Sequence, residues 1–144
     1  MRLMGLDVGD KTVGVAVSDE LGLTAQGVTT VERRSWAHDL AELDAIAKEN
    51  SVQKLVVGLP LNMDGSEGPR ALASRAFAER ASAALGIPFD LWDERLSTAE
   101  VQRLLIAADV SRKKRKQVVD KLAAQVILQG YLDSRPAREK DAPS

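Results

Sequence analysis

The sequence predicts an α/β domain built on a five-stranded mixed sheet with helices on both faces. Two observations lead to this prediction. The first 32 residues contain three strand-like segments separated by turns, the pattern of an antiparallel meander. Beyond residue 35, segments with helical spacing alternate with two short apolar runs, which require crossover connections. We therefore expect these last two strands to lie parallel to each other in the same sheet.

The three strands of the meander are predicted at residues 3–8, 12–18 and 23–32. The first is nearly continuous apolar sequence, as expected of an inner strand, and Gly9 and Asp10 supply the turn that follows it. The second alternates valines with other residues, and the third is rich in β-branched residues, with Gly27 as the candidate position of a bulge.

Helical spacing marks the rest of the chain. The predicted helices begin at residues 35, 70, 97 and 118, and the two apolar strands cover residues 54–59 and 87–92. Ser35 is a candidate N-cap, Gly86 a candidate C-cap, and Ser97 with Glu100 forms a capping-box pattern. In the first helix the apolar spacing places Asp39 on the face away from the core.

The length and composition indicate a single domain. A chain of 144 residues with 44% apolar residues can bury one core, which we expect to span residues 1–134, with a flexible tail at residues 135–144. The absence of cysteine excludes disulfides, a thiolate zinc site and a cysteine nucleophile. The apolar run before Asp7 is too short for a signal peptide, so a cytoplasmic location is expected.

Charge is nearly balanced over the chain but locally concentrated. A net charge of −1 argues against a broadly cationic nucleic-acid binder. Five consecutive cations nevertheless suggest one defined contact with a polyanion, and they are Arg112, Lys113, Lys114, Arg115 and Lys116. The alternative interpretation of this basic run is a solvated loop.

Three acids occupy positions where an acid is structurally expensive. Asp7 ends the first strand, and Glu94 follows the fifth. Asp120 shares a helical face with Ala123, Ala124 and Ile127, a face that should pack on the sheet. Each also has an ordinary interpretation: a turn-forming aspartate, an exposed acid before a helix, and a solvated acid in a frayed first turn.

Two strand ends and a helix packed over them are expected to converge at one rim of the sheet. Carboxylates that converge repel one another unless a cation joins them, and Asp and Glu oxygens with water are the ligands of Mg²⁺ or Mn²⁺. Two such ions would activate water and stabilise the leaving oxygen in phosphodiester cleavage. The one histidine, His38, is not needed as a base and is expected to be solvated.

Four motifs in this order resemble the YqgF/RuvX family. They are MGLDVGDKTVGVAVSD at residues 4–19, VVGLPLNMDGSEG at 56–68, DERLST at 93–98 and VDKLAA at 119–124. The resemblance extends over about residues 2–134 and implies an RNase H-like fold. It also implies a bacterial-type nuclease, described as a Holliday junction resolvase and as the enzyme that matures the 5′ end of the 16S ribosomal RNA precursor.

The resemblance carries roles over to individual residues. Asp7, Glu94 and Asp120 match the family's metal-binding acids, and Asp7 would bridge two metal ions while each of the others completes one site. Lys11, Arg95 and the basic run would hold phosphates. One departure is Thr12, where relatives often have arginine, which removes one expected phosphate contact. The polar loop at residues 62–68 would lie near the same rim, where it would shape access or simply pack.

Other functions remain open from the sequence. The glycine-containing motif around Asp7 also resembles the first phosphate loop of actin-like ATPases. Those proteins need a second domain and a second glycine-rich, adenosine-binding loop, and neither is found in these 144 residues. A non-catalytic ribosome-assembly factor would keep the scaffold without needing all three acids. Within the nuclease interpretation, the substrate is precursor RNA or branched DNA, and paired cuts on a junction would require a homodimer.

Overall fold

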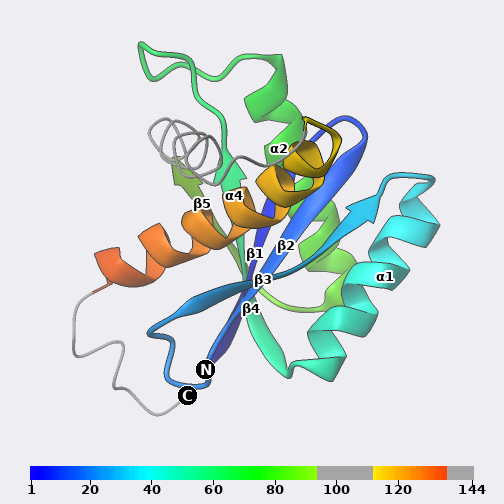
Figure 1. The fold of residues 1–144 in the computed structure, drawn as a ribbon, viewed down its shortest axis with the longest axis vertical. Helices are drawn as coiled ribbons and strands as arrows, with labels where there is room; N and C mark the ends of the chain where they lie inside the picture. The colour runs from blue at the N-terminus through cyan, green and yellow to red at the C-terminus, as the bar shows by residue number, and fades with distance from the viewer. Residues whose placement is uncertain (94–111, 136–144) are drawn as a thin grey trace.

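The structure is a computed structural model that describes residues 1–93 and 112–135, with the backbone alone for residues 112–120. Figure 1 labels its elements in chain order. These are β1 (Arg2–Val8), β2 (Thr12–Ser18), β3 (Ala25–Glu32), α1 (Trp36–Glu49), β4 (Val52–Leu59), α2 (Pro69–Leu85), β5 (Phe89–Asp93) and α4 (Arg112–Ser134).

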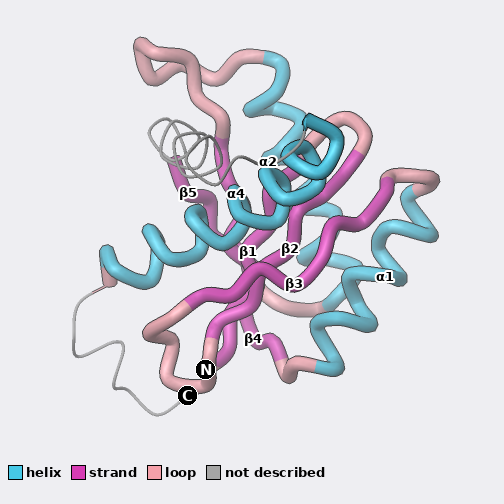
Figure 2. Tube along the Cα trace, in the orientation of Figure 1, coloured by secondary structure: helices cyan, strands magenta, loops and turns pink. Residues whose placement is uncertain are grey.

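The five strands form one mixed sheet in the order β3-β2-β1-β4-β5 (Figure 2). Strand β1 pairs antiparallel with β2 and parallel with β4, and β5 pairs parallel with β4. The meander and the parallel pair predicted from the sequence are thus confirmed. Because β1, β4 and β5 run in one direction, their C-terminal ends lie along one edge of the sheet, called the carboxyl rim below.

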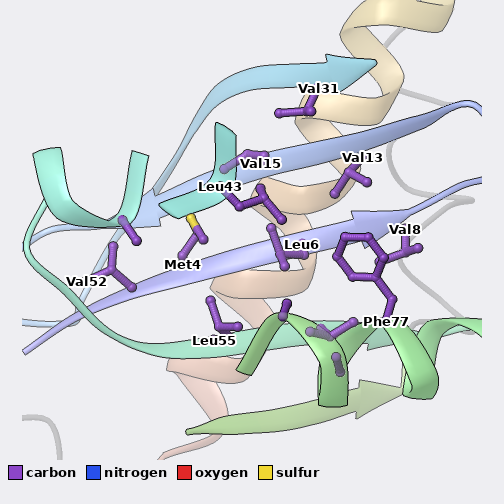
Figure 3. Packing of buried hydrophobic residues seen from close by; sticks show 14 residues of the cluster. Met4, Leu6, Val8, Val13, Val15, Val31, Leu43, Val52, Leu55 and Phe77 are labelled. Carbon is purple, nitrogen blue, oxygen red and sulfur yellow. The ribbon is translucent and has the colours of Figure 1, made fainter. Parts of the chain in front are cut away.

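Helices cover both faces of the sheet, and each face has its own core. Helices α1 and α2 cover the face that carries Met4 and Leu6 of β1, where Leu43 and Phe77 complete the larger cluster (Figure 3). Helix α4 covers the opposite face and packs on Leu3 of β1 through residues that include Ala124, Ile127, Leu128 and Leu132. Alternate residues of β1 therefore enter different cores, as the two-residue period of a strand requires.

Helix α4 lies close to the sheet because two strand positions carry no side chain. A Cβ atom at Gly5 would lie 2.7 Å from Cβ of Leu128 and 3.0 Å from the carbonyl oxygen of Ala124. A Cβ atom at Gly27 would lie 2.5 Å from Cγ of Lys121. Any larger residue at these positions would push the helix outward.

Two glutamines of α4 also bind the backbone of the strand at the edge of the sheet. Gln125 Oε1 accepts the N–H of Gly27 at 3.2 Å, and Gln129 Oε1 accepts the N–H of Ala25 at 2.9 Å. The Gln129 amide donates to the carbonyl oxygen of Leu23 at 2.9 Å. These bonds fix the helix along β3 as well as across β1.

The local signals read from the sequence are largely confirmed. Ser35 caps α1 by accepting the N–H of His38, and Gly86 ends α2 in the left-handed conformation with φ 71°. The register between β2 and β3 skips Val28, one residue from the bulge predicted at Gly27. The helix predicted from Ser97 lies outside the described residues, as do residues 136–144 of the predicted tail.

The predicted start of the last helix at residue 118 is wrong. Helix α4 already includes Arg112, so the basic run is helical instead of a loop before the helix. Lysine and arginine have high helix propensity, and neither glycine nor proline interrupts residues 112–118. Residues 112–116 contain no apolar side chain, so helical periodicity of apolar residues could not extend the predicted helix to them.

The close approach of α4 predicts that Gly5→Ala destabilises the protein. The added methyl group meets the Leu128 side chain and the Ala124 backbone, so we expect a loss of about 1–3 kcal/mol, the usual cost of overpacking. Urea denaturation measures the loss, and amide hydrogen exchange should show that α4 loses protection.

Gly86→Ala is the matched control. No atom lies within 4 Å of a Cβ at this position, so its cost of about 1 kcal/mol comes from the positive φ alone and leaves α4 protected. A Gly5→Ala protein as stable as the wild type would contradict the packing described above.

Candidate active site

Strand β1 brings Asp7 to the carboxyl rim on the face covered by α4. Met4, Leu6 and Val8 enter the core under α1 and α2, whereas Leu3 enters the core under α4. Asp7 alternates with the first set and so lies on the α4 face, where it is half-buried. This is the only face of the sheet on which α4 can approach it.

The backbone of α4 brings position 120 toward the same place. The helix runs antiparallel to β3, because Gln125 binds Gly27 while the later Gln129 binds the earlier Ala25. Strands β1 and β3 are both antiparallel to β2, so the helix is antiparallel to β1 as well. Position 120 is one turn before Ala124, a displacement of about 6 Å along the helix. Asp7 is two residues beyond Gly5, about 6.6 Å along the strand in the same direction. The two predicted acids therefore lie on facing elements at one rim.

The other predicted site residues are placed in part. Glu94 and Arg95 lie outside the described residues, directly after β5, which ends at the rim with Asp93. Lys11 is exposed in the turn between β1 and β2. The run Arg112, Lys113, Lys114, Arg115 and Lys116 lies on α4, one to two turns before position 120. Among the side chains that the structure describes, no group of three His, Asp or Glu residues gathers as a metal site.

The turn between Asp7 and Lys11 is tightly bonded. Gly9 N–H donates to the carbonyl oxygen of Thr12 at 2.8 Å, which closes the turn. Two further bonds come from Arg33, at the end of β3: its N–H donates to the Lys11 carbonyl oxygen at 2.8 Å, and its Nη1 donates to the Gly9 carbonyl oxygen at 2.9 Å. No motif or spacing in the sequence marked Arg33 as part of the site.

Asp39, predicted to face away from the core, is instead buried, with 2% of its surface exposed. Its Oδ1 accepts the Arg34 N–H at 3.0 Å and contacts His38 Nδ1 at 2.9 Å, and its Oδ2 lies 3.8 Å from Arg33 Nε. Burial opposes the charge, but the hydrogen bonds from His38 and Arg34 and the nearby cationic groups outweigh it. The pKa of Asp39 therefore lies below its ordinary value.

A sequence signal for this burial exists. Asp39, Leu43 and Ala47 are spaced four residues apart, and all three are buried along one stripe of α1. His38, predicted to be solvated, has 31% of its side chain exposed and pairs with Asp39. The two corrections are linked, because Arg33 and Arg34 from the segment before the helix bind Asp39, and Asp39 in turn binds His38.

A polar cluster holds the second half of α4 to the sheet. The Tyr131 hydroxyl donates to Asp90, and Lys54 Nζ lies 2.6 Å from the same Asp90 oxygen. Partial burial disfavours the Asp90 charge, but bonds from Lys54 and Tyr131 outweigh it and lower the pKa of Asp90. Trp92 packs edge-on against Tyr131, with ring centroids 6.2 Å apart. Together with Gln125 and Gln129, this cluster fixes where α4 meets the rim.

The loop after β4 also lies at the rim, as predicted, and Figure 2 shows it extending beyond the sheet. It is folded on itself: Asn62 N–H donates to the Ser66 carbonyl oxygen, and Asp64 accepts the N–H and hydroxyl of Ser66. Met63 has 92% of its surface exposed in this loop.

A search of the described helices for a segment with the length and hydropathy of a membrane span found none.

Comparison with known sequences identifies close relatives. The profile of the RuvX family, described as Holliday junction resolvase, matches residues 1–134. A protein of Myxococcus xanthus named "Putative pre-16S rRNA nuclease" is 60% identical over 141 residues, which cover 98% of this chain and 93% of that protein. A protein of Clostridioides difficile with the same name is 58% identical over 132 residues, covering 92% and 94% of the two chains.

Comparison with solved structures identifies a shared fold. The chain is similar to T. thermophilus RuvC in complex with a Holliday junction substrate, with a TM-score of 0.57, 13% identity and coverage of 93% of this chain and 97% of that one. It is also similar to the Fowlpox virus resolvase in complex with junction DNA, with a TM-score of 0.53, 11% identity and coverage of 93% and 98%. These likenesses confirm the predicted RNase H-like fold. The profile match over residues 1–134 and the sequence relatives show that the chain belongs to the YqgF/RuvX family.

Proposed function

We propose that the protein is a divalent-metal-dependent endonuclease that hydrolyses phosphodiester bonds in structured nucleic acid, with the 5′ end of the 16S ribosomal RNA precursor as its substrate. One observation supports the mechanism: Ala124 and Leu128 of α4 lie against Gly5 of β1, two residues before Asp7 and one to two turns after position 120. Family membership and the names of the relatives support the nuclease activity and the RNA substrate. This function corresponds to a cytoplasmic protein whose nuclease domain is the matched region, residues 1–134.

Asp7, Asp120 and Glu94 are the residues proposed to hold the metal. Carboxylate oxygens are the donors that Mg²⁺ and Mn²⁺ prefer, and the half-buried Asp7 at the open end of a sheet fits such a site. Two ions held there would activate the attacking water and stabilise the leaving oxygen. Asp7, on the central strand, would contribute to both ions, and Glu94 and Asp120 would each contribute to one of them.

The basic groups around the rim are proposed to bind the substrate backbone. Lys11 extends from the turn that follows Asp7, and Arg95 follows Glu94 directly in the sequence. The cations of residues 112–116 begin the helix that carries Asp120. Phosphate contacts from both sides of the acids would orient the backbone without reading base sequence.

Branched DNA is the second candidate substrate. The family carries the description Holliday junction resolvase, and two solved proteins of the same fold are bound to junctions. Symmetric resolution of a junction would additionally require a homodimer that presents two rims. The RNA substrate is preferred because it is the one named for relatives at 57–60% identity.

The metal mechanism predicts that Asp7→Asn abolishes cleavage. Asparagine keeps the shape but loses the charge, so we expect the rate to fall by at least about 100-fold while nucleic-acid affinity changes little. The assay compares cleavage of a precursor 16S RNA leader and a four-way DNA junction, each with Mg²⁺ or Mn²⁺ and after chelation by EDTA. Glu94→Gln should behave as Asp7→Asn does.

Asp44→Asn is the matched control, because it removes an equal charge from α1, where Asp44 pairs with Lys48. Its activity should equal that of the wild type. Full cleavage by Asp7→Asn would refute the metal mechanism. A wild-type protein that cuts neither substrate but is stabilised by ATP and Mg²⁺ would favour the ATP-binding alternative.

The phosphate-binding role of the basic run predicts a weaker salt dependence when two of its charges are removed. In Lys113→Ala/Lys114→Ala, the slope of log K against log salt should decrease in magnitude by roughly 1.4–1.8, because each lost phosphate contact contributes about 0.7–0.9. Titration of labelled RNA at several salt concentrations measures the slope. Lys48→Ala, on α1, should leave it unchanged; equal slopes for all three proteins would assign the run to a solvated helix end.

A further inference from the structure

The guanidinium of Arg33 joins the turn that follows Asp7 to the beginning of α1. It donates to the carbonyl oxygen of Gly9, which is beyond the last residue pair of the β1–β2 ladder, Val8 with Val13. We propose that Arg33 is a positioning residue that fixes the turn at residues 9–11 and thereby directs Asp7 and Lys11. This inference rests on the proposed function, in which Asp7 binds metal and Lys11 binds phosphate.

Asp39 holds Arg33 in this orientation. The Asp39 side chain is 3% exposed, and its Oδ2 lies 3.8 Å from Arg33 Nε. Its other oxygen is fixed by the Arg34 N–H and by His38, so the carboxylate cannot rotate without losing both bonds. A buried carboxylate with its own partners is a rigid anchor for a neighbouring cation.

Two aromatic rings hold the other side of the guanidinium. The Arg33 Cζ atom lies 5.4 Å from the ring centroid of Trp36 and 5.2 Å from that of Phe77, and these two rings pack 5.4 Å apart. Planar guanidinium groups stack well on aromatic faces, and lysine cannot reproduce this geometry. Arg33 is therefore held by an acid, by two rings and by the turn at once.

The adjacent residue, Arg34, is a mostly exposed arginine and serves as the control for Arg33. Arg34 has 68% of its side chain exposed, and its Nη2 lies 3.4 Å from the exposed Glu32. Its backbone N–H, which binds Asp39, survives any substitution of the side chain except proline. Arg34→Ala thus removes the same charge one residue away without altering the bonds to the turn.

The consequence for the site follows from how metal ligands work. Residues that orient a ligand without touching the metal typically change affinity or activity by about 10- to 100-fold when replaced. Loss of the Arg33 guanidinium would leave the Gly9 carbonyl to water and allow the turn to adopt other conformations. Lys11, in this turn, and Asp7, two residues before Gly9 on β1, would then spend less time in the productive orientation.

The test compares Arg33→Ala with Arg34→Ala in the full-length protein. Mn²⁺ affinity is measured without nucleic acid by electron paramagnetic resonance of the free ion, and kcat and KM are measured on the substrate that the wild type cuts. Amide exchange reports on the Gly9 N–H. We expect Arg33→Ala to weaken Mn²⁺ binding and lower kcat by about 10- to 100-fold and to speed Gly9 exchange. Arg34→Ala should match the wild type in all three.

A second pair of variants separates positioning from a loss of folding. Asp39→Asn should change Mn²⁺ affinity in the same direction as Arg33→Ala but less. The double variant should be no worse than Arg33→Ala alone, because both residues act through one contact. Unfolding by urea establishes that each variant is folded under the assay conditions.

The outcomes distinguish the inference from the function on which it rests. If the wild type cuts nucleic acid and Arg33→Ala matches Arg34→Ala in Mn²⁺ affinity and kcat, the inference is wrong and the proposed function stands. Unchanged Gly9 exchange in Arg33→Ala would overturn the inference in the same way. If the wild type neither binds Mn²⁺ nor cuts either nucleic acid, the proposed function fails and the inference fails with it.

Discussion

The close packing of α4 on β1 is the constraint on which the site depends. Gly5 has no side chain, so the backbone of Ala124 and the side chain of Leu128 can approach the strand directly. Position 120 is one turn before Ala124 on the helix, and Asp7 is two residues after Gly5 on the strand. The distance between helix and strand at Gly5 therefore determines how far position 120 lies from Asp7. Hydrogen bonds from the later turns of α4 restrict sliding of the helix, because such bonds have directional requirements that apolar contacts lack. The proposed metal site, with two of its acids on different elements, therefore depends on the glycine at position 5 that lets these elements approach.

Much of this architecture follows from local sequence patterns. The meander is predictable because strand periodicity and turn residues act over a few positions, and Ser35 and Gly86 mark helix ends by bonds or dihedral angles within one turn. The three acids were predicted as metal ligands because an acid at the end of an apolar strand or on an apolar helix face requires compensation, and their joint role stays a prediction. Their expected convergence follows from strand direction.

The features that sequence reasoning missed all depend on contacts between distant segments or on charge without periodicity. The bond from Arg33 to Gly9 joins residues 24 positions apart, although the spacing of Asp39, Leu43 and Ala47 did carry a signal for the burial of Asp39. The beginning of α4 was misplaced because five cations carry no apolar spacing. The cluster of Lys54, Asp90 and Tyr131 joins three elements, which no single window of sequence contains.

The glutamine bonds to β3 also affect how this protein meets other copies of itself. An exposed strand at the end of a sheet offers unpaired N–H and C=O groups, which invite edge-to-edge association and aggregation. Here Gln125 and Gln129 occupy the N–H groups of Gly27 and Ala25 and the carbonyl group of Leu23. The helix that carries a proposed catalytic acid therefore also discourages unwanted polymerisation through this strand, and a subunit added along it would first have to displace these side chains.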